Sequence, residues 1–166
     1  MISIEKYNFL HFEALTSYQL DAEQARFVRQ PWQWFEGQTL LLSNNMTGVT
    51  ILENGVAIGF FVLDRGMEKF EYTNNQQAIL LRSFSINPHY QGNGFATAAL
   101  APNLIDSFIY NLSPKYNEIV LAVNPLNQRA YQLYLRCGFQ AAGRVIINVR
   151  GARSVLVRQI GATDGN

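Results

Sequence analysis

A glycine turn between an apolar run and a small-residue segment constrains the fold of this chain most strongly. Residues 91–97 read Q-G-N-G-F-A-T, directly after an apolar run at residues 79–86 and before an alanine-rich helical pattern. A strand, a glycine turn and a helix start in this order build a phosphate site. The glycines let an anion approach the backbone, and the first helical N–H groups lack intrahelical partners. The sequence therefore indicates a phosphate-bearing cofactor.

Length, charge and cysteine content exclude several classes of protein. The chain has 166 residues, 48% of them hydrophobic, and a formal net charge of +1 without a basic run, which argues against nucleic-acid or anionic-membrane binding driven by bulk charge. Its single cysteine, Cys137, excludes an internal disulfide and a multi-cysteine zinc site, and we expect no metal cofactor. No apolar run approaches the roughly 20 residues that span a bilayer. We expect a soluble, cytoplasmic protein.

The hydrophobic pattern predicts one domain over residues 1–161, followed by a disordered tail at residues 162–166. Two short helical pieces are expected before Pro31, a longer helix from the glycine turn to about Tyr110 with a kink at Pro102, and a last helix over residues 127–137. Alternating or continuous apolar runs predict strands at residues 2–6, 49–52, 56–63, 79–86, 119–123, 139–149 and 154–160. This order is typical of a mixed α/β sheet with helices on its faces.

Two motifs give the chain a resemblance to the GNAT superfamily of acetyl-CoA-dependent N-acyltransferases. The first, at residues 86–96, reads I-N-P-H-Y-Q-G-N-G-F-A, and the second, at residues 127–139, reads N-Q-R-A-Y-Q-L-Y-L-R-C-G-F. Both occur in the family's order and at the family's spacing. The resemblance implies an α/β fold with a mixed, mainly antiparallel sheet of about 6–7 strands and about four helices.

The resemblance also implies a reaction and a set of site residues. An amine attacks the thioester of acetyl-CoA directly, without a covalent enzyme intermediate, and Tyr134 protonates the departing CoA thiolate. The implied acceptor is a small-molecule or peptide amine, and the resemblance leaves open whether the chain forms a homodimer. Residues implied to bind the cofactor are Phe84 and Ile86 at the pantetheine arm, Gln91, Gly92, Asn93, Gly94, Phe95, Ala96 and Thr97 at the pyrophosphate, and Asn127.

The spacing within the second motif supports this interpretation independently. Asn127 and Tyr134 are seven residues apart, almost two helical turns, so both side chains lie on one helix face. A tyrosine is neutral at pH 7 and can donate a proton. Structural alternatives stay open for each feature. The glycine turn can be a tight connection only, Asn127 a helix N-cap, and Tyr134 a core residue.

The expected general base is missing from the two strands that would carry it. Many GNAT relatives place a glutamate there, but residues 79–86 and 119–123 hold no acid, and Glu118 lies only at the mouth of the second strand. A water chain, a carboxylate from elsewhere or an acceptor that is already neutral can replace it. Arg82, in mid-strand, is unusual because an arginine there needs a carboxylate, solvent or an acidic acceptor.

The remaining polar and aromatic candidates are expected to be structural. We expect a solvated loop position for His89, an unpartnered structural role for His11, and a buried apolar environment for Cys137. Ser83 and Ser85 are expected to face one side of a strand. An aromatic cluster can either line an acceptor pocket or pack in the core, and it comprises Trp32, Trp34 and Phe35.

Two other functions compete with the acetyltransferase. A domain of the same fold can bind acyl-CoA as a sensor without turnover, and the missing acid keeps that alternative open. A dinucleotide-binding oxidoreductase requires G-x-G-x-x-G with an acid about 20 residues further on. Here the third glycine position holds Thr97, and the next strand ends at Asn124, so the sequence argues against this class.

Overall fold

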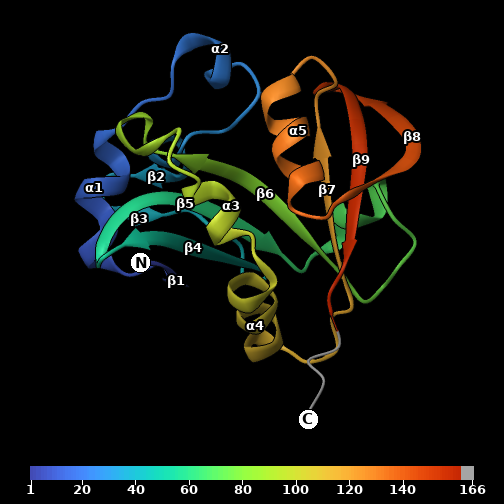
Figure 1. Cartoon of the computed structure of the whole chain (residues 1–166), viewed down its shortest axis with the longest axis horizontal. Coiled ribbons are helices and arrows are strands. Elements are labelled where there is room, and N and C mark those ends of the chain that lie inside the picture. Colours follow the sequence, from blue (N-terminus) through green and yellow to red (C-terminus); the bar gives the residue numbers. More distant parts are fainter. Residues whose placement is uncertain (162–166) are drawn as a thin grey trace.

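A seven-stranded sheet organises the chain (Figure 1). The structure is a computed structural model that describes residues 1–161; the tail predicted to be disordered lies outside the described residues. In sheet order, the strands are β1 (Ile2–Lys6), β4 (Met46–Glu53), β5 (Val56–Asp64), β6 (Ala78–Ile86), β7 (Glu118–Val123), β9 (Gly151–Gln159) and β8 (Gln140–Asn148). Every neighbouring pair is antiparallel except β6 and β7, which confirms the mixed, mainly antiparallel sheet.

Short helices and one small hairpin complete the described fold. A two-stranded sheet pairs β2 (Phe35–Glu36) with β3 (Thr39–Leu40), and the sequence pattern did not indicate it. The 3₁₀ helices are η1 (Phe9–His11), η2 (Pro31–Trp34), η3 (Met67–Glu71) and η4 (Pro88–Tyr90). The α-helices are α1 (Phe12–Ser17), α2 (Ala22–Ala25), α3 (Phe95–Ala99), α4 (Pro102–Leu112) and α5 (Gln128–Arg136).

The predicted long helix with a kink at Pro102 is wrong, because the chain forms two separate helices there. Ala101 is extended, with φ −67° and ψ 143°, and Pro102 is the first residue of α4. The proline ring disfavours helical backbone at the residue before it, and proline fits the first helical position because no intrahelical N–H bond is needed. The break lets α3 and α4 pack at different angles against the sheet.

Two hairpins join strands that the sequence pattern predicts, one between β4 and β5 and one between β8 and β9. Asn54 (φ 48°) and Gly55 (φ 84°) adopt the left-handed conformations that a tight two-residue turn between β4 and β5 requires. The closing hairpin turns at Val149 and Arg150, slightly earlier than predicted, and β9 already begins at Gly151. Arg150 lies in this turn and pairs with Glu68 of η3, which becomes important for the site.

Two of the three core clusters within residues 1–161 lie on opposite faces of the sheet. Adjacent β5 residues alternate between them: Phe61 belongs to the cluster under α3, α4 and α5, whereas Phe60 and Val62 belong to the cluster under α1 and η2. Figure 1 shows α3, α4 and α5 on the near face of the sheet. Fully buried residues of the larger cluster include Ile51, Ile79, Leu100, Ile105, Ile109 and Ile119. Helices are therefore fixed on both faces.

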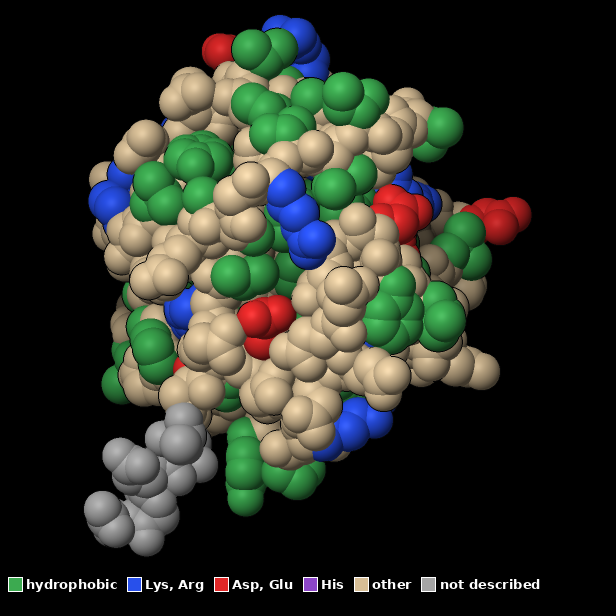
Figure 2. Space-filling view, turned by 90° about the vertical axis from the view of Figure 1, so that its right-hand side faces the viewer, with side chains coloured by type: hydrophobic (Ala, Val, Ile, Leu, Met, Phe, Trp, Pro, Cys, Tyr) green, Lys and Arg blue, Asp and Glu red, His purple; other side chains and the backbone are tan. Residues whose placement is uncertain are grey.

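The outer edge strand β8 is largely exposed. Val145 is 55% and Ile147 is 83% exposed. Figure 2 views the molecule from the β8 side, where hydrophobic side chains lie in several groups among polar atoms. Within residues 1–161, every helix is too short or too polar to pass through a lipid bilayer.

Candidate active site

The parallel strands β6 and β7 separate toward their carboxyl ends. Their pairing covers only three residue pairs, ending at Leu80 with Val120. Beyond that point β6 stays paired with β5 as far as Ile86, and β7 stays paired with β9 as far as Val123. Figure 1 shows the two strands diverging. The facing backbone edges are thus left without strand partners, and a cavity of about 560 Å³ opens beside them.

A bulge in β6 shapes one wall of this cavity. Val62 pairs with Arg82 and Phe60 with Ser85, so β6 holds one more residue than β5 between these pairs. Ser83 adopts φ +58° at the bulge. Ser83 and Ser85 both line the cavity, and Ser85 is buried, with its hydroxyl 2.9 Å from that of Tyr18. The extra residue interrupts the regular alternation of the strand at this point.

The predicted glycine turn closes one end of the cavity. Gly92 (φ +80°) and Gly94 (φ +78°) are left-handed, and a Cβ added to either would have no neighbour within 4 Å. Gly94 is the N-cap of α3, so the first N–H groups of this helix have no intrahelical acceptor. The predicted residues that line the cavity here are Gln91, Gly92, Gly94, Phe95, Ala96 and Thr97. Asn93 does not; its amide donates to the carbonyls of Tyr90 and Gln91, both at 3.2 Å.

The second motif supplies the opposite wall through α5. Asn127 is the N-cap, and its Oδ1 accepts a hydrogen bond from the Ala130 N–H at 3.3 Å. Asn127 and Tyr134 both line the cavity, as their spacing predicted. Asn127 is therefore a helix N-cap, as one of the two interpretations expected, and it also forms part of the cavity wall. Gly138 (φ +88°) follows the helix in the expected left-handed position.

Tyr134 lies in an aromatic cluster where β6 meets α5. Its ring packs edge-on against Phe84, with centroids 6.4 Å apart, and against Phe139 at 5.7 Å. Only 9% of Tyr134 is exposed. Burial, with a smaller contribution from the nearby Cys137 thiol, raises the pKa of the phenol above its ordinary value of 10.0. The hydroxyl therefore keeps its proton at neutral pH and can only donate it.

Arginines dominate the charged lining of the cavity. No Asp, Glu or His from residues 1–161 lines it. His89 is exposed outside it, and Glu118, at the start of β7, accepts a hydrogen bond from Gln159 at 2.7 Å. Neither can act as a base in the cavity as it stands. The lining arginines are Arg29, Arg82, Arg129, Arg136, Arg150 and Arg153. Arg129 and Arg136 lie on α5 and Arg82 lies on β6. The other three come from a loop and the closing hairpin, and only Arg82 was singled out in the sequence.

Arg82 has the carboxylate partners that its mid-strand position requires. It lies 3.0 Å from Asp64 Oδ2 and also pairs with Glu68, which in turn lies 2.8 Å from Arg150. Asp64 is only 2% exposed and accepts a further hydrogen bond from the Gly66 N–H at 2.8 Å. This network holds Arg82 and Arg150 at the cavity wall.

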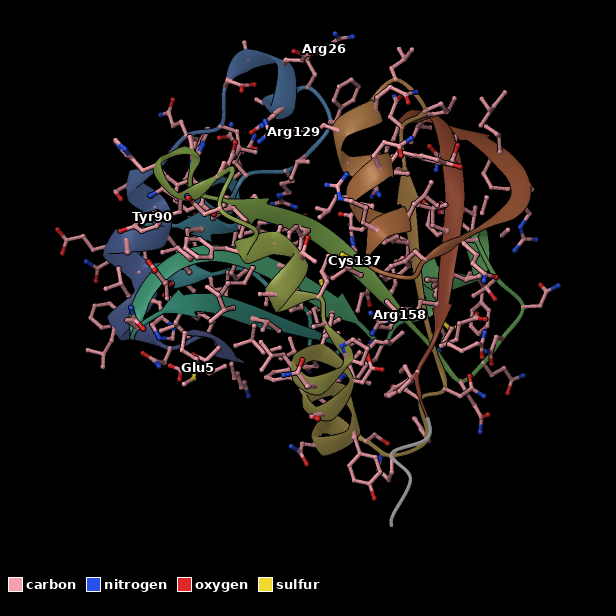
Figure 3. The ribbon with its side chains drawn as sticks, in the orientation of Figure 1. Glu5, Arg26, Tyr90, Arg129, Cys137 and Arg158 are labelled. Carbon is pink, nitrogen blue, oxygen red and sulfur yellow. The ribbon has the colours of Figure 1, made fainter. Side chains whose placement is uncertain are left out.

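Helix α2 reaches over the glycine turn. Asp21 caps it by accepting a hydrogen bond from the Gln24 N–H at 2.8 Å. The Gln24 side chain does not complete a capping box but pairs with Gln91 of the glycine turn. Figure 3 shows Arg26 at the outer tip of α2 and Arg129 between α2 and α5, with Cys137 at the far end of α5.

The other candidate residues have structural surroundings. Cys137 is outside the cavity, and burial raises the pKa of its thiol, while Thr97 and two arginines oppose that effect. His11 is structural, but the expectation that it lacks a partner is wrong, because its Nε2 lies 2.9 Å from Glu5. Figure 3 places Glu5 far from α5. The aromatic cluster of Trp32, Trp34 and Phe35 does not line the cavity.

Comparison with known proteins identifies the family. Residues 9–139 match the acetyltransferase (GNAT) family. The chain is a member of the GNAT acetyltransferase family. This GNAT protein is 35% identical over 156 residues to the uncharacterized N-acetyltransferase YbbJ of Bacillus subtilis (strain 168), covering 93% of this chain and 95% of the relative. It is accordingly an acetyl-CoA-dependent acyltransferase.

Solved GNAT structures share the fold of this chain. The aminoglycoside acetyltransferase AAC(6')-Ib in complex with coenzyme A superimposes with a TM-score of 0.75 at 15% identity, covering 96% of this chain and 95% of that one. The spermidine N-acetyltransferase from Vibrio cholerae, in complex with CoA and spermine, gives 0.66 at 16% identity, with 96% and 95% coverage. At these identities the likeness concerns the fold.

Proposed function

We propose that this GNAT acetyltransferase moves the acetyl group of acetyl-CoA to a primary amine of a small-molecule or peptide acceptor, by direct attack, with Tyr134 as general acid. One observation carries the proposal. The unpaired edge of β6 leads from the buried Tyr134 to the glycine turn, all along a single cavity. A pantetheine arm is an extended chain with two amides, so it suits a strand edge that lacks a partner.

The residues present fit a nucleotide thioester. Backbone groups of Phe84 and Ile86 lie on the open side of β6 and would pair with the pantetheine amides. The space beside Gly92 and Gly94 would take the pyrophosphate, where a side chain would exclude it. Amides at the start of α3 favour an anion there. Acetyl-CoA itself supplies an activated acetyl group as a thioester.

Tyr134 is suited to deliver a proton to the departing sulfur. It lines the cavity between Phe84 and α5, and its raised pKa keeps the phenol protonated. General acid catalysis of this kind contributes about 10²- to 10⁴-fold to a rate. No carboxylate base is needed opposite Tyr134 if the acceptor enters as a free amine.

Thermal melts and thiol release test this function together. At a hundredfold excess over Kd, acetyl-CoA should stabilise the protein by about 2.7 kcal/mol, which is roughly 5–10 °C in Tm for a chain of this size. NAD serves as the control and should give no shift. A shift with NAD and none with acetyl-CoA would contradict the proposal. Binding without free thiol across a broad amine panel would favour an acyl-CoA-binding domain without turnover.

A further inference from the structure

Four arginines gather at the cavity end that lies away from the glycine turn. Arg82 and Arg150 are joined through Glu68, and the guanidiniums of Arg29 and Arg82 lie 3.9 and 5.7 Å from the ring centre of Trp34. Arg29, Arg150 and Arg153 also line an adjoining cavity of about 380 Å³. No residue of the glycine turn or α5 lines that second cavity, so the space beside these three arginines extends beyond the expected pyrophosphate site.

The positive charge of this group is only partly neutralised. Asp64 and Glu68 are the two carboxylates that pair with it, and both bind Arg82, while Glu68 also binds Arg150. Among residues 1–161, Arg29 and Arg153 form no ion pair. Four guanidiniums against two carboxylates leave two positive charges. The excess is local, because the whole chain carries only +1.

Within residues 1–161, Arg29 and Arg153 have no carboxylate partner, and Arg29 is held in one orientation. Arg29 stacks on Trp34, and one of its terminal nitrogens donates to the Gln33 carbonyl at 2.9 Å, which fixes the guanidinium plane. Burial, Arg82 and Arg150 lower the pKa of Arg29, so the groups act on one another electrostatically. The Nε of Arg153 is buried and has no hydrogen-bond partner among the described residues. A buried donor without a partner is costly unless a ligand satisfies it.

We propose that the acceptor is an amine that also carries a carboxylate or phosphate group, which Arg29 and Arg153 bind. This inference rests on the proposed acetyltransferase function and names its substrate class. Guanidiniums bind both anions through paired, charge-assisted hydrogen bonds. The same field repels polycations, so an acceptor such as the spermine of the Vibrio cholerae complex would be disfavoured here.

The arginine group also accounts for the missing base. A positive environment disfavours the charged form of an ammonium group and therefore lowers its pKa. Asp64 and Glu68 already neutralise Arg82 and Arg150, so a carboxylate bound by Arg29 and Arg153 leaves one positive charge in excess beside the acceptor. An acceptor amine bound there loses its proton more readily than in water, which reduces the need for a carboxylate.

Matched pairs of acceptors test the substrate class. Each pair shares one amine and differs in one anionic group: glucosamine 6-phosphate with glucosamine, and β-alanine with β-alanine amide, with spermidine as the polycation. The kcat/KM of at least one anionic member should exceed that of its neutral partner by about 10- to 100-fold. The pair that responds distinguishes phosphate from carboxylate. Equal rates within both pairs, or the highest rate with spermidine, would overturn the proposal.

Arginine variants then locate the anion site. Arg29→Gln and Arg153→Gln each remove a charge that no carboxylate pairs with, so neither strands a buried acid; Lys6→Gln, on the exposed edge strand β1, removes one charge elsewhere. Each cavity variant should lower kcat/KM for the anionic acceptor about 10-fold and shift its pH–rate profile to higher pH, with KM for acetyl-CoA unchanged. Lys6→Gln should do neither.

The outcomes separate the two proposals. If the cavity variants raise KM for acetyl-CoA and leave acceptor preference intact, these arginines bind cofactor phosphates and the acceptor proposal fails. If wild-type protein gives no thermal shift with acetyl-CoA, the proposed function itself fails. Circular dichroism and thermal melts confirm that each variant is folded, and either arginine variant alone suffices for the test.

Discussion

Gln24 and Gln91 exchange two side-chain amide hydrogen bonds, at 3.2 and 3.1 Å, across 67 residues of sequence. The Gln91 amide also donates to the Ile86 carbonyl at 2.8 Å. One side chain thus connects α2, the glycine turn and the end of β6. Since α2 has only four residues and buries none of them, this pair fixes its position over the cavity.

Gln24→Ala should weaken acetyl-CoA binding without unfolding the protein. Loss of the amide pair frees Gln91 and the glycine turn, so KM for acetyl-CoA should rise about 2- to 10-fold, as the loss of one net hydrogen bond predicts. Glu23→Ala, on the exposed side of the same helix, is the control. An unchanged KM in Gln24→Ala would mean that the pair does not restrain the turn.

Tyr134→Phe should reduce kcat by about 10²- to 10⁴-fold with little change in KM for acetyl-CoA. The substitution keeps the aromatic packing against Phe84 and Phe139 and removes only the proton donor. Tyr131 is a second tyrosine on α5, three positions before Tyr134, and it does not line the cavity. Tyr131→Phe should therefore retain wild-type kcat. Wild-type kcat in Tyr134→Phe would assign Tyr134 to the core.

Gly94→Ala should separate backbone strain from ligand exclusion. With φ +78° at this position any L-residue is strained, by about 1–2 kcal/mol, and valine more so. Gly55→Ala, at φ +84° in the β4–β5 turn, carries the same strain far from the cavity. Both variants should lose similar stability by thermal melt. Only Gly94→Ala should lose acetyl-CoA affinity, by at least about 10-fold. If Gly94→Ala and Gly55→Ala bind acetyl-CoA equally well, the phosphates bind elsewhere.

The pH–rate profile should rise steadily through the neutral and alkaline range. The cavity lining within residues 1–161 offers no carboxylate or imidazole, so the rate follows deprotonation of the acceptor amine. Burial raises the pKa of Tyr134 above 10.0, so the acid stays protonated and the rate should not fall before pH 10. Initial rates at saturating acetyl-CoA measure this.

A plateau with an apparent pKa near roughly 6–7 would instead indicate a tuned base. Glu118→Gln and His89→Ala are the two variants to examine in that case, because Glu118 starts β7 and His89 lies within the first motif. Loss of the plateau in either variant would show that this side chain acts as the base and contradict a cavity without one.

Asp106→Asn should destabilise the fold strongly. Asp106 and Arg158 are 3% and 7% exposed and form a buried ion pair, and Arg158 also donates to the Leu100 carbonyl at 2.7 Å. Removing one charge of a buried pair leaves the other uncompensated, which costs about 3–5 kcal/mol. Denaturant unfolding measures the loss, with Glu13→Gln on exposed α1 as the control. A loss below about 1 kcal/mol would contradict a structural role for the pair.

Local signals explain which parts of the site could be predicted from the sequence. The glycine turn and the face that joins Asn127 to Tyr134 follow from residue types a few positions apart. The break at Pro102 carried the same kind of signal, because the residue before a proline avoids helix, yet a kink was expected.

Long-range contacts explain what the sequence did not reveal. Ser83 has a left-handed backbone at the bulge, but the bulge contains no glycine or asparagine that would indicate this conformation in the sequence. The bulge also depends on the register between β6 and β5. The arginine group combines a loop after α2, strand β6, the β8–β9 turn and strand β9. Only Arg82 could be predicted to need a carboxylate, and Asp64 provides it at 3.0 Å.

The short β6–β7 pairing has a mechanical consequence. Three residue pairs join a half-sheet of β1, β4, β5 and β6 to a half-sheet of β7, β9 and β8, so the two halves can twist about that junction. A ligand that hydrogen-bonds to the open edge would act as an interior strand and stiffen the joint. Amide hydrogen exchange should then slow in both half-sheets when the cavity fills, which makes ligand binding the last step in assembling a continuous sheet.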